Sequence, residues 1–188
     1  MALGRKPGKS RAFLNESGLY DYAVKALGRR MRTEAELRRL MRARVEPGDA
    51  GEAVIAAVVR RLKEYGYLDD QSYAETFARL RQENEKLGRR AVRQKLAQKG
   101  VAARIVEETV DARYSGTDEE ALARQYLERK RIRKPEGEKE TARVMRRLVA
   151  AGFTTGVIYR ILRAWDVPDE ALASLDNLAD EAAEDSHE

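Results

Sequence analysis

Apolar residues recur at intervals of three and four positions along almost the whole chain from residue 18 to residue 165. This spacing places them on one face of an α-helix and strongly limits what the chain can fold into. No segment alternates apolar and polar residues between hairpin turns, as a half-buried strand would. The pattern predicts an all-α protein with helices over 18–29, 33–44, 49–65, 70–85, 88–99, 101–114, 118–133, 138–151 and 154–165.

Residues with capping chemistry stand at several of the predicted helix ends. Gly100 and Gly152 occupy places where a left-handed residue ends a helix. Three further pairs have capping-box spacing at predicted helix starts: Thr33 with Glu36, Asp49 with Glu52, and Thr117 with Glu120.

The predicted helices fall into three sets of three, because their apolar positions repeat about every 50 residues. Each set carries one apolar stripe per helix and can close a small core. The first helices align at Tyr22-Ala23, Tyr73-Ala74 and Leu122-Ala123, the second at Leu37/Met41, Val92/Leu96 and Val144/Leu148, and the third at Val54-Ile55, Ile105-Val106 and Val157-Ile158.

This repeat predicts three tandem three-helix units that form an elongated, curved array, which is right- or left-handed. We expect the units to span 17–66, 67–116 and 117–165. Residues 1–16 lack periodicity and predict a flexible basic arm, and residues 166–188 predict an acidic, disordered tail.

Charge is distributed unevenly along the chain. The net charge is +5, but residues 166–188 hold nine acids and no Lys or Arg, so residues 1–165 carry 37 basic and 23 acidic groups. A body this basic attracts polyanions or acidic protein surfaces. The alternative is that the charges only keep the helices soluble. The acidic tail is either inert or masks the basic body.

Composition excludes several functional classes. The chain has no cysteine, which excludes disulfides, thiol nucleophiles and thiolate zinc sites. Its longest apolar run, 53–59, is too short to span a bilayer, and no apolar stretch follows the basic N-terminus as in a secretory signal. Gly8-Lys9-Ser10 is no phosphate loop, because Leu3 stands where that loop needs glycine. We expect a cytoplasmic, monomeric protein without enzymatic activity, cofactor or metal.

Basic residues occupy the predicted outer faces of the repeated helices. On a helical wheel, Arg38, Arg39 and Arg42 lie opposite Leu37. Arg90 and Arg93 point away from the apolar stripe of their helix in the same way, as does Arg146 in the third unit. The partner-binding or DNA-binding residues predicted in this way are Arg29, Arg30, Arg38, Arg39, Arg42, Arg89, Arg90, Arg93, Arg129, Lys130, Arg131 and Arg133.

The basic cluster over 129–134 has a second interpretation. Cations near a helix C-terminus complement the helix dipole, although one or two suffice for that. We therefore favour a contact surface.

Tyr67 and Asp70 stand at the junction of the first two predicted units. We expect Asp69 or Asp70 to cap the next helix, while Tyr67 and Leu68 pack the junction. The alternative is that Tyr65, Tyr67 and Tyr73 stack on nucleobases.

An ordered set of short motifs over roughly 17–165 resembles the RecX family of regulatory proteins. The resemblance is strongest over 20–110. Members usually have proline after the glycine that begins the fifth helix, where this chain has Arg89. The matching blocks are Ala26-Leu27-Gly28-Arg29-Arg30 with Glu36-Leu37-Arg38-Arg39, Gly66-Tyr67-Leu68-Asp69-Asp70 with Tyr73-Ala74, and Leu87-Gly88-Arg89-Arg90-Ala91-Val92-Arg93-Gln94-Lys95-Leu96 with Lys99-Gly100-Val101.

This resemblance implies a partner, the RecA recombinase. RecX proteins bind RecA, lodge in the groove of its filament on DNA, and restrain filament growth, ATPase activity and strand exchange. Members of the family also bind DNA, so that single- or double-stranded DNA is a second implied partner. A row of units that touches successive protomers would combine several weak contacts.

Two rival hypotheses remain. Tandem three-helix units can act directly on DNA by inserting a helix into the major groove. The predicted third helices, however, expose acids such as Glu107, Glu108 and Asp111, which do not suit base readout. The other rival is a helical scaffold that binds neither DNA nor RecA.

Overall fold

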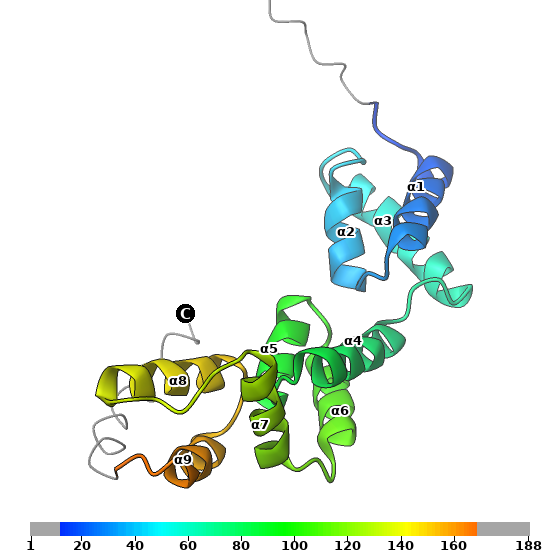
Figure 1. The fold of residues 1–188 in the computed structure, drawn as a ribbon. Coiled ribbons are helices and arrows are strands. Elements are labelled where there is room, and N and C mark those ends of the chain that lie inside the picture. The colour runs from blue at the N-terminus through cyan, green and yellow to red at the C-terminus, as the bar shows by residue number, and fades with distance from the viewer. Residues whose placement is uncertain (1–11, 169–188) are drawn as a thin grey trace, which may run out of the picture. The chain divides into compact units, whose positions relative to one another are not determined.

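The computed structural model describes residues 12–168, and this part of the chain is built of α-helices without strands (Figure 1). None of its helices is long and apolar enough to cross a membrane. The predicted arm and acidic tail lie mostly outside the described residues. The helices are α1 (Glu16–Arg29), α2 (Glu34–Arg42), α3 (Asp49–Glu64), α4 (Asp70–Glu85), α5 (Arg89–Gln98), α6 (Ala103–Tyr114), α7 (Glu119–Arg129), α8 (Glu138–Ala150) and α9 (Thr155–Ala164).

All of the helices predicted from apolar periodicity are present, and the prediction of an all-α fold is confirmed. Most of the apolar positions that align between the three repeats are buried in the structure. The alanines in first helices are fully buried, and the paired positions in second and third helices are buried in nearly every case. These core residues are Ala23, Ala74, Ala123, Leu37, Met41, Val92, Leu96, Val144, Leu148, Ile55, Val106, Val157 and Ile158.

The described chain folds into two compact units. The first contains residues 12–73 together with 99–101, and the second contains residues 74–98 and 102–168. The boundaries of the three predicted repeat units, which rest on equivalent helices in the sequence, stay a prediction.

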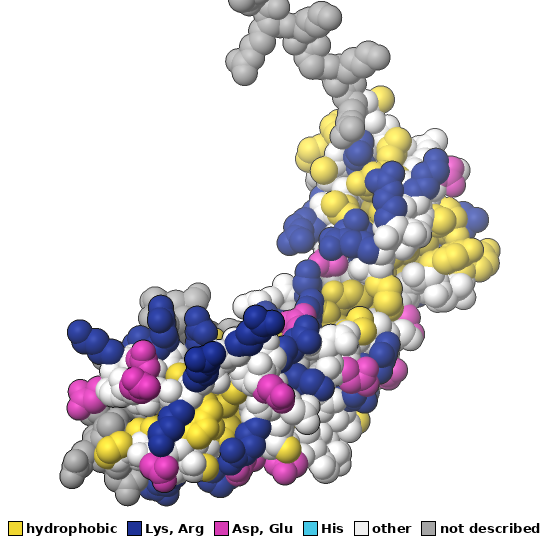
Figure 2. Space-filling view, viewed as in Figure 1, with side chains coloured by type: hydrophobic (Ala, Val, Ile, Leu, Met, Phe, Trp, Pro, Cys, Tyr) yellow, Lys and Arg dark blue, Asp and Glu magenta, His cyan; other side chains and the backbone are white. Residues whose placement is uncertain are grey.

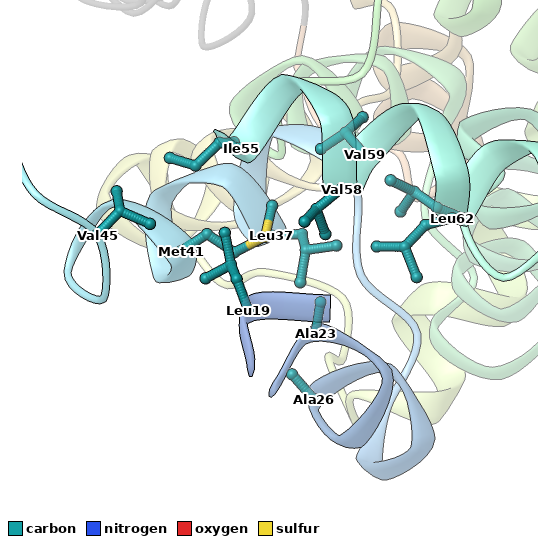
Figure 3. Close-up of a cluster of buried hydrophobic side chains, with 11 residues drawn as sticks. Leu19, Ala23, Ala26, Leu37, Met41, Val45, Ile55, Val58, Val59 and Leu62 are labelled. Atoms are coloured by element: carbon teal, nitrogen blue, oxygen red, sulfur yellow. The ribbon is translucent and has the colours of Figure 1, made fainter. Parts of the chain in front are cut away.

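The core of the first unit lies between α1, α2 and α3 (Figure 3). Helix α3 packs against both α1 and α2. It contributes Ile55, Val58 and Leu62, which are fully buried, and α2 contributes Leu37 and Met41. Burying each such side chain contributes roughly 1.5–3 kcal/mol, so this core is what holds α2 and its arginines in place.

Polar contacts at the start of α2 complete the first unit. The Thr33 hydroxyl accepts a hydrogen bond from the Glu36 amide (3.1 Å) and donates one to the Lys99 carbonyl (2.7 Å). The Glu36 carboxylate, 6% exposed, accepts from Lys99 Nζ (2.8 Å). The predicted Thr33 cap is therefore confirmed, and it is part of a network that fixes residues 99–101 against α2.

The other two predicted capping boxes are wrong. Helix α3 begins after Gly48, which has no side chain to cap it, and Asp49 is the first helical residue. Helix α7 begins after Asp118, whose carboxylate accepts from the Glu120 amide (2.9 Å). A carboxylate at that place accepts from two amides of the first turn, so it takes the capping position in preference to the hydroxyl of Thr117, one residue earlier.

Helix α7 ends at Arg129, four residues before its predicted end at Arg133. The Ile132 amide donates to the Leu127 carbonyl (2.9 Å), and Arg131 adopts the left-handed conformation with a φ of 54°. This is the Schellman arrangement that ends many helices. The prediction of a continuous basic helix through residue 133 is wrong because Arg131 takes the left-handed position in which a sequence reading expects glycine.

Glycines are required where α5 and α8 meet in the second unit. The Gly88 amide donates to the Ala151 carbonyl (2.8 Å), which joins the start of α5 to the end of α8. A methyl group on Gly152 would overlap the amide of Ala91, and Gly152 has a φ of +89°. The predicted left-handed end at Gly152 is confirmed, and so is that at Gly100, with a φ of +76°.

The rest of the second unit is held by helix packing and one buried hydroxyl. Helix α5 packs on α6, and α9 packs on both α7 and α8. The Tyr114 hydroxyl, on a side chain that is 1% exposed, donates to the Leu87 carbonyl (2.7 Å). Burial raises the pKa of Tyr114 well above its ordinary value, so the hydroxyl keeps its proton and remains a donor.

Candidate partner-binding surface

Four of the arginines predicted to contact a partner are already paired with acids of the same chain. Their side chains are positioned by helix packing, and each meets a carboxylate on its own or a neighbouring helix. Because these charges are compensated internally, they are less available to a partner. The pairs are Arg38 with Glu34 (2.7 Å), Arg42 with Glu52 (2.6 Å), Arg89 with Glu119 (2.6 Å), and Arg93 with Glu107 (2.8 Å) and Asp111 (3.1 Å).

The Arg42–Glu52 pair shows the electrostatic consequence. The hydrogen bond from Arg42 and the charge of its guanidinium lower the pKa of Glu52, and the same contact raises the pKa of Arg42. Both side chains are largely exposed, so water and salt screen the pair and its contribution to stability is small.

The remaining predicted basic residues are exposed and form no ion pair within residues 12–168. They lie at the end of α1, on α2, at the start of α5, and at the end of α7 with the loop that follows. These residues are Arg29, Arg30, Arg39, Arg90, Arg129, Lys130, Arg131 and Arg133.

Three helix ends of the second unit meet at one place. The Arg90 amide, in the first turn of α5, donates to the Gly152 carbonyl just beyond the end of α8 (3.4 Å). The next residue, Phe153, packs its ring edge-on against Tyr126 of α7, with ring centroids 6.0 Å apart. The start of α5 and the ends of α7 and α8 are therefore neighbours.

Basic residues from all three helices gather at this meeting point. Arg146 and Arg147 lie in the last turns of α8, and Arg129 and Lys130 follow Tyr126 by about one turn of α7. Burial raises the pKa of Tyr126, and the charge of Arg147 lowers it. We call this set the helix-end cluster: Arg90, Arg129, Lys130, Arg146 and Arg147.

Within the described residues, no member of the helix-end cluster forms an ion pair. All five side chains are exposed, and Figure 2 shows Lys and Arg side chains gathered on the side of the second unit where α7 and α8 lie. Exposed cations without ion-pair partners on neighbouring helix ends give a positive local potential, which attracts polyanions.

Dipole complementarity explains only part of this cluster. Cations at the ends of α7 and α8 complement the partial negative charge of those termini. Arg90 lies instead at the start of α5, where the partial charge is positive and a cation is unfavourable. Its presence indicates a surface that gathers positive charge rather than one that neutralises helix ends.

Sequence reasoning did not single out two exposed arginines of α8, of which Arg147 belongs to the helix-end cluster. Arg143 and Arg147 are four residues apart and share a helix face with Arg146, whereas Val144 and Leu148 are buried. All three arginines are exposed. The same helical-wheel test that identified the arginines of α2 would have found them, because their spacing puts them on one helix face.

Asp69 and Asp70 have separate roles at the start of α4. Asp69 caps the helix, since its carboxylate accepts from the amides of Gln71 (2.8 Å) and Ser72 (3.2 Å). Asp70 instead accepts from the Glu34 amide at the start of α2 (2.8 Å). Burial, together with the Glu34 charge, raises the pKa of Asp70 above its ordinary value, against the lowering effect of that hydrogen bond.

Tyr67 does not pack the junction as predicted. Its side chain is 57% exposed, whereas the neighbouring Leu68 is 3% exposed and belongs to the core of the first unit. Tyr67 follows the left-handed Gly66, which has a φ of 71° and ends α3.

The described residues contain no group of three or more His, Asp or Glu side chains placed to hold a metal ion. A shallow depression lies between the loop before α8 and the residues after α9, with Trp165 and Thr141 among its lining. Lys134, Glu138 and Asp166 also line it, and Lys134 forms an ion pair with Asp166 (3.3 Å). The fold and surface thus define a class, that of all-helical repeat proteins with a basic surface.

Comparisons with known proteins identify the family within this class. A family model described as the second three-helix domain of RecX matches residues 69–110. Regulatory protein RecX of Mycolicibacterium vanbaalenii is 33% identical over 154 residues, covering 80% of each chain, and that of Thermobifida fusca is 36% identical over 143 residues, covering 74% of each. The chain belongs to the RecX family of regulatory proteins.

Solved structures support the same fold. The crystal structure of RecX from Lactobacillus salivarius aligns with a TM-score of 0.64 at 20% sequence identity, covering 80% of this chain and 96% of that one. A second RecX crystal structure aligns with a TM-score of 0.65. The tandem three-helix architecture predicted from the repeat is therefore that of solved RecX structures.

Proposed function

We propose that this protein binds the RecA recombinase and its filament on DNA and restrains filament growth, ATPase activity and strand exchange. It acts as a cytoplasmic monomer and catalyses no reaction of its own. Membership of a family of regulatory proteins supports the regulatory role. The partner and the direction of the effect are the proposal.

The helix-end cluster is the observation that carries this proposal. A nucleoprotein filament presents DNA phosphates and acidic protein side chains, and both suit a surface with several uncompensated cations. The paired arginines of α2 and α5 suit it less, because a partner would first have to compete with Glu34, Glu52 or Glu107.

The experiment compares two double variants with the same change in charge. Arg146→Gln/Arg147→Gln neutralises two residues of the helix-end cluster, and Arg38→Gln/Arg42→Gln neutralises two paired arginines. The first variant should weaken inhibition of the DNA-dependent ATPase of cognate RecA by about tenfold or more, as the loss of two charge contacts predicts. The second variant should lose less inhibition, because Arg38 and Arg42 already form ion pairs with acids of the same chain.

Circular dichroism and urea unfolding verify that both variants remain folded. Full inhibition of ATPase activity and strand exchange by the folded Arg146→Gln/Arg147→Gln variant would contradict the role of the cluster. If the Arg38→Gln/Arg42→Gln variant alone lost inhibition, the contact surface would lie on α2, as the helical wheel first predicted.

A further inference from the structure

The end of α3 exposes two aromatic side chains, those of Tyr65 and Tyr67. Tyr65, the last-turn cap of α3, is 62% exposed, and Tyr67, just beyond Gly66, is 57% exposed. Figure 2 shows hydrophobic side chains exposed at the edge of the first unit where α3 ends in Figure 1.

The same Schellman hydrogen bonds end α3, α7, α8 and α9, which allows a direct comparison; Ile132, the corresponding residue after α7, is partly buried. In each case the residue after the left-handed position donates its amide to a carbonyl five residues back. That residue normally packs against the helix. Phe153 after α8 is 1% exposed and Val167 after α9 is 8% exposed, whereas Tyr67 after α3 is 57% exposed. Tyr67 therefore has no packing role that would explain an aromatic residue at this place.

An arginine lies beside these rings. The Arg61 guanidinium is 4.4 Å from the centroid of the Tyr20 ring and 5.8 Å from that of Tyr65. The hydrogen bond from the Tyr67 amide to the Leu62 carbonyl (2.9 Å) folds the chain back beside the last turn of α3, close to Arg61. The tyrosine surface is defined as Arg61, Tyr65 and Tyr67.

Charge around the tyrosine surface favours an anionic ligand. Neither Arg60 nor Arg61 forms an ion pair with another described residue, and both are exposed. Of the nearby acids, Asp69 is engaged in capping α4, while Glu64 is exposed. Ring faces and guanidinium planes beside uncompensated cations are the features with which proteins hold single-stranded nucleic acids.

Few other large hydrophobic side chains close to the rings in the sequence are exposed. The centre of a protein interface is an apolar patch, within which aromatic residues are packed and shielded from water. Among the described residues, the other exposed large hydrophobics are Phe13, Met31 and Leu80, and none belongs to residues 60–69. Tyr65 and Tyr67 lie on either side of Gly66, between the exposed Glu64 and the buried Leu68, and their exposed ring faces are available for stacking.

We propose that the tyrosine surface stacks unpaired nucleobases of single-stranded DNA, with Arg60 and Arg61 meeting the phosphates. The inference deepens the proposed function by adding a base-contacting surface to the phosphate-contacting helix-end cluster. Its test uses DNA without RecA, so that its failure leaves the regulation of RecA untouched.

The experiment compares two fluorescent oligonucleotides of equal length, an oligo-dT of about 20 nucleotides and an abasic strand with the same number of phosphates. The full chain should bind oligo-dT at least about fivefold more tightly than the abasic strand, because stacking needs bases. The Tyr65→Ala/Tyr67→Ala variant should bind both strands almost equally. Tyr65→Phe/Tyr67→Phe keeps the rings and should keep the preference.

Two controls separate stacking from charge and from loss of structure. Leu80→Ala removes an exposed apolar side chain elsewhere and should leave the preference unchanged. Arg146→Gln/Arg147→Gln should weaken binding to both strands by the same factor and reduce the salt dependence, whereas the tyrosine variant keeps the salt dependence. Urea unfolding verifies that each variant is folded.

Either of two results would overturn the proposal. One is a wild-type chain that binds the abasic strand as tightly as oligo-dT. The other is a folded Tyr65→Ala/Tyr67→Ala variant that retains the preference; if this variant also bound RecA more weakly, the tyrosines would be a protein contact instead.

Discussion

At the scale of single residues, the absence of a side chain at Gly152 is what brings the helix-end cluster together. The backbone of Ala91 occupies the space that a Cβ on Gly152 would need. This close approach allows the Arg90 amide to reach the Gly152 carbonyl and puts the first turn of α5 beside the last turn of α8. Gly152, which has no side chain, thus allows the helix ends that carry the cluster's cations to lie close together.

Replacing Gly152 with alanine should destabilise the protein. The new methyl group overlaps the α5 backbone, and alanine disfavours a φ of +89°. We expect the free energy of unfolding to fall by more than about 2 kcal/mol, measured by urea denaturation. Gly156→Ala is the matched control: its nearest atom would be Arg160 at 3.9 Å, and alanine in α9 should raise stability by up to about 1 kcal/mol. Equal stability of the two variants would contradict the packing role of Gly152.

The pairing of arginines shows how far a sequence predicts a surface. A helical wheel gives the outward direction of Arg42 and Arg93 but says nothing about what lies across from them. Arg42 meets Glu52 on α3, and Arg93 meets Asp111 on α6, because separate helices pack side by side. Whether an exposed cation is free thus depends on tertiary packing, which the periodicity of one helix does not contain.

At the scale of the elements, apolar periodicity predicted where helices lie better than capping chemistry predicted how they end. Burial fixes the helical phase, since a whole stripe of residues must face the core. Each end depends on one or two local groups. At α7 those groups are Asp118, which replaces the predicted cap, and Arg131, which turns the chain without glycine.

The network at the start of α2 predicts a pH dependence. Burial raises the pKa of Glu36, but the hydrogen bond and charge of Lys99 outweigh it, so the pKa lies below its ordinary value. A lowered pKa in the folded state means that the ionised carboxylate stabilises the fold at neutral pH. This contribution is lost as the pH falls through the folded-state pKa, below the ordinary value of about 4.3.

Glu36→Gln should therefore lower the free energy of unfolding at pH 7 by roughly 1–2 kcal/mol, as for a hydrogen bond to a charged group. The difference from wild type should shrink as the pH is lowered below about 4. Urea denaturation at both pH values provides the measurement. Glu64→Gln, an exposed carboxylate at the end of α3, is the control. A pH-independent effect of Glu36→Gln would show that its charge is not what stabilises the network.

At the scale of the whole molecule, the C-terminal segment is acidic and the rest of the chain is basic. Residues 169–188, which lie outside the described residues, contain eight acids and no Lys or Arg. The remainder carries all 37 basic residues, including the helix-end cluster and Arg61 of the tyrosine surface. Total charge governs the long-range attraction between a protein and a nucleic acid, whatever the positions of the individual charges.

Deleting residues 169–188 should therefore strengthen binding to DNA at low salt. The deletion changes the net charge from +5 to +13, because it removes eight acids and no basic residue. The truncated chain should bind a DNA duplex more tightly at about 0.05 M salt, and the two affinities should converge towards ~1 M, where screening is complete within a few ångströms. Fluorescence anisotropy over a salt series measures both affinities.

A full-length variant in which the eight acids are replaced by their amides separates charge from chain length. If charge is the cause, this variant should bind DNA like the truncated chain, since both lose the same negative charge. Equal affinity of the wild-type and truncated chains at low salt would mean that the acidic segment neither screens nor masks the basic body. An effect of truncation without an effect of the amides would show that residues 169–188 act through their bulk, not through their charge.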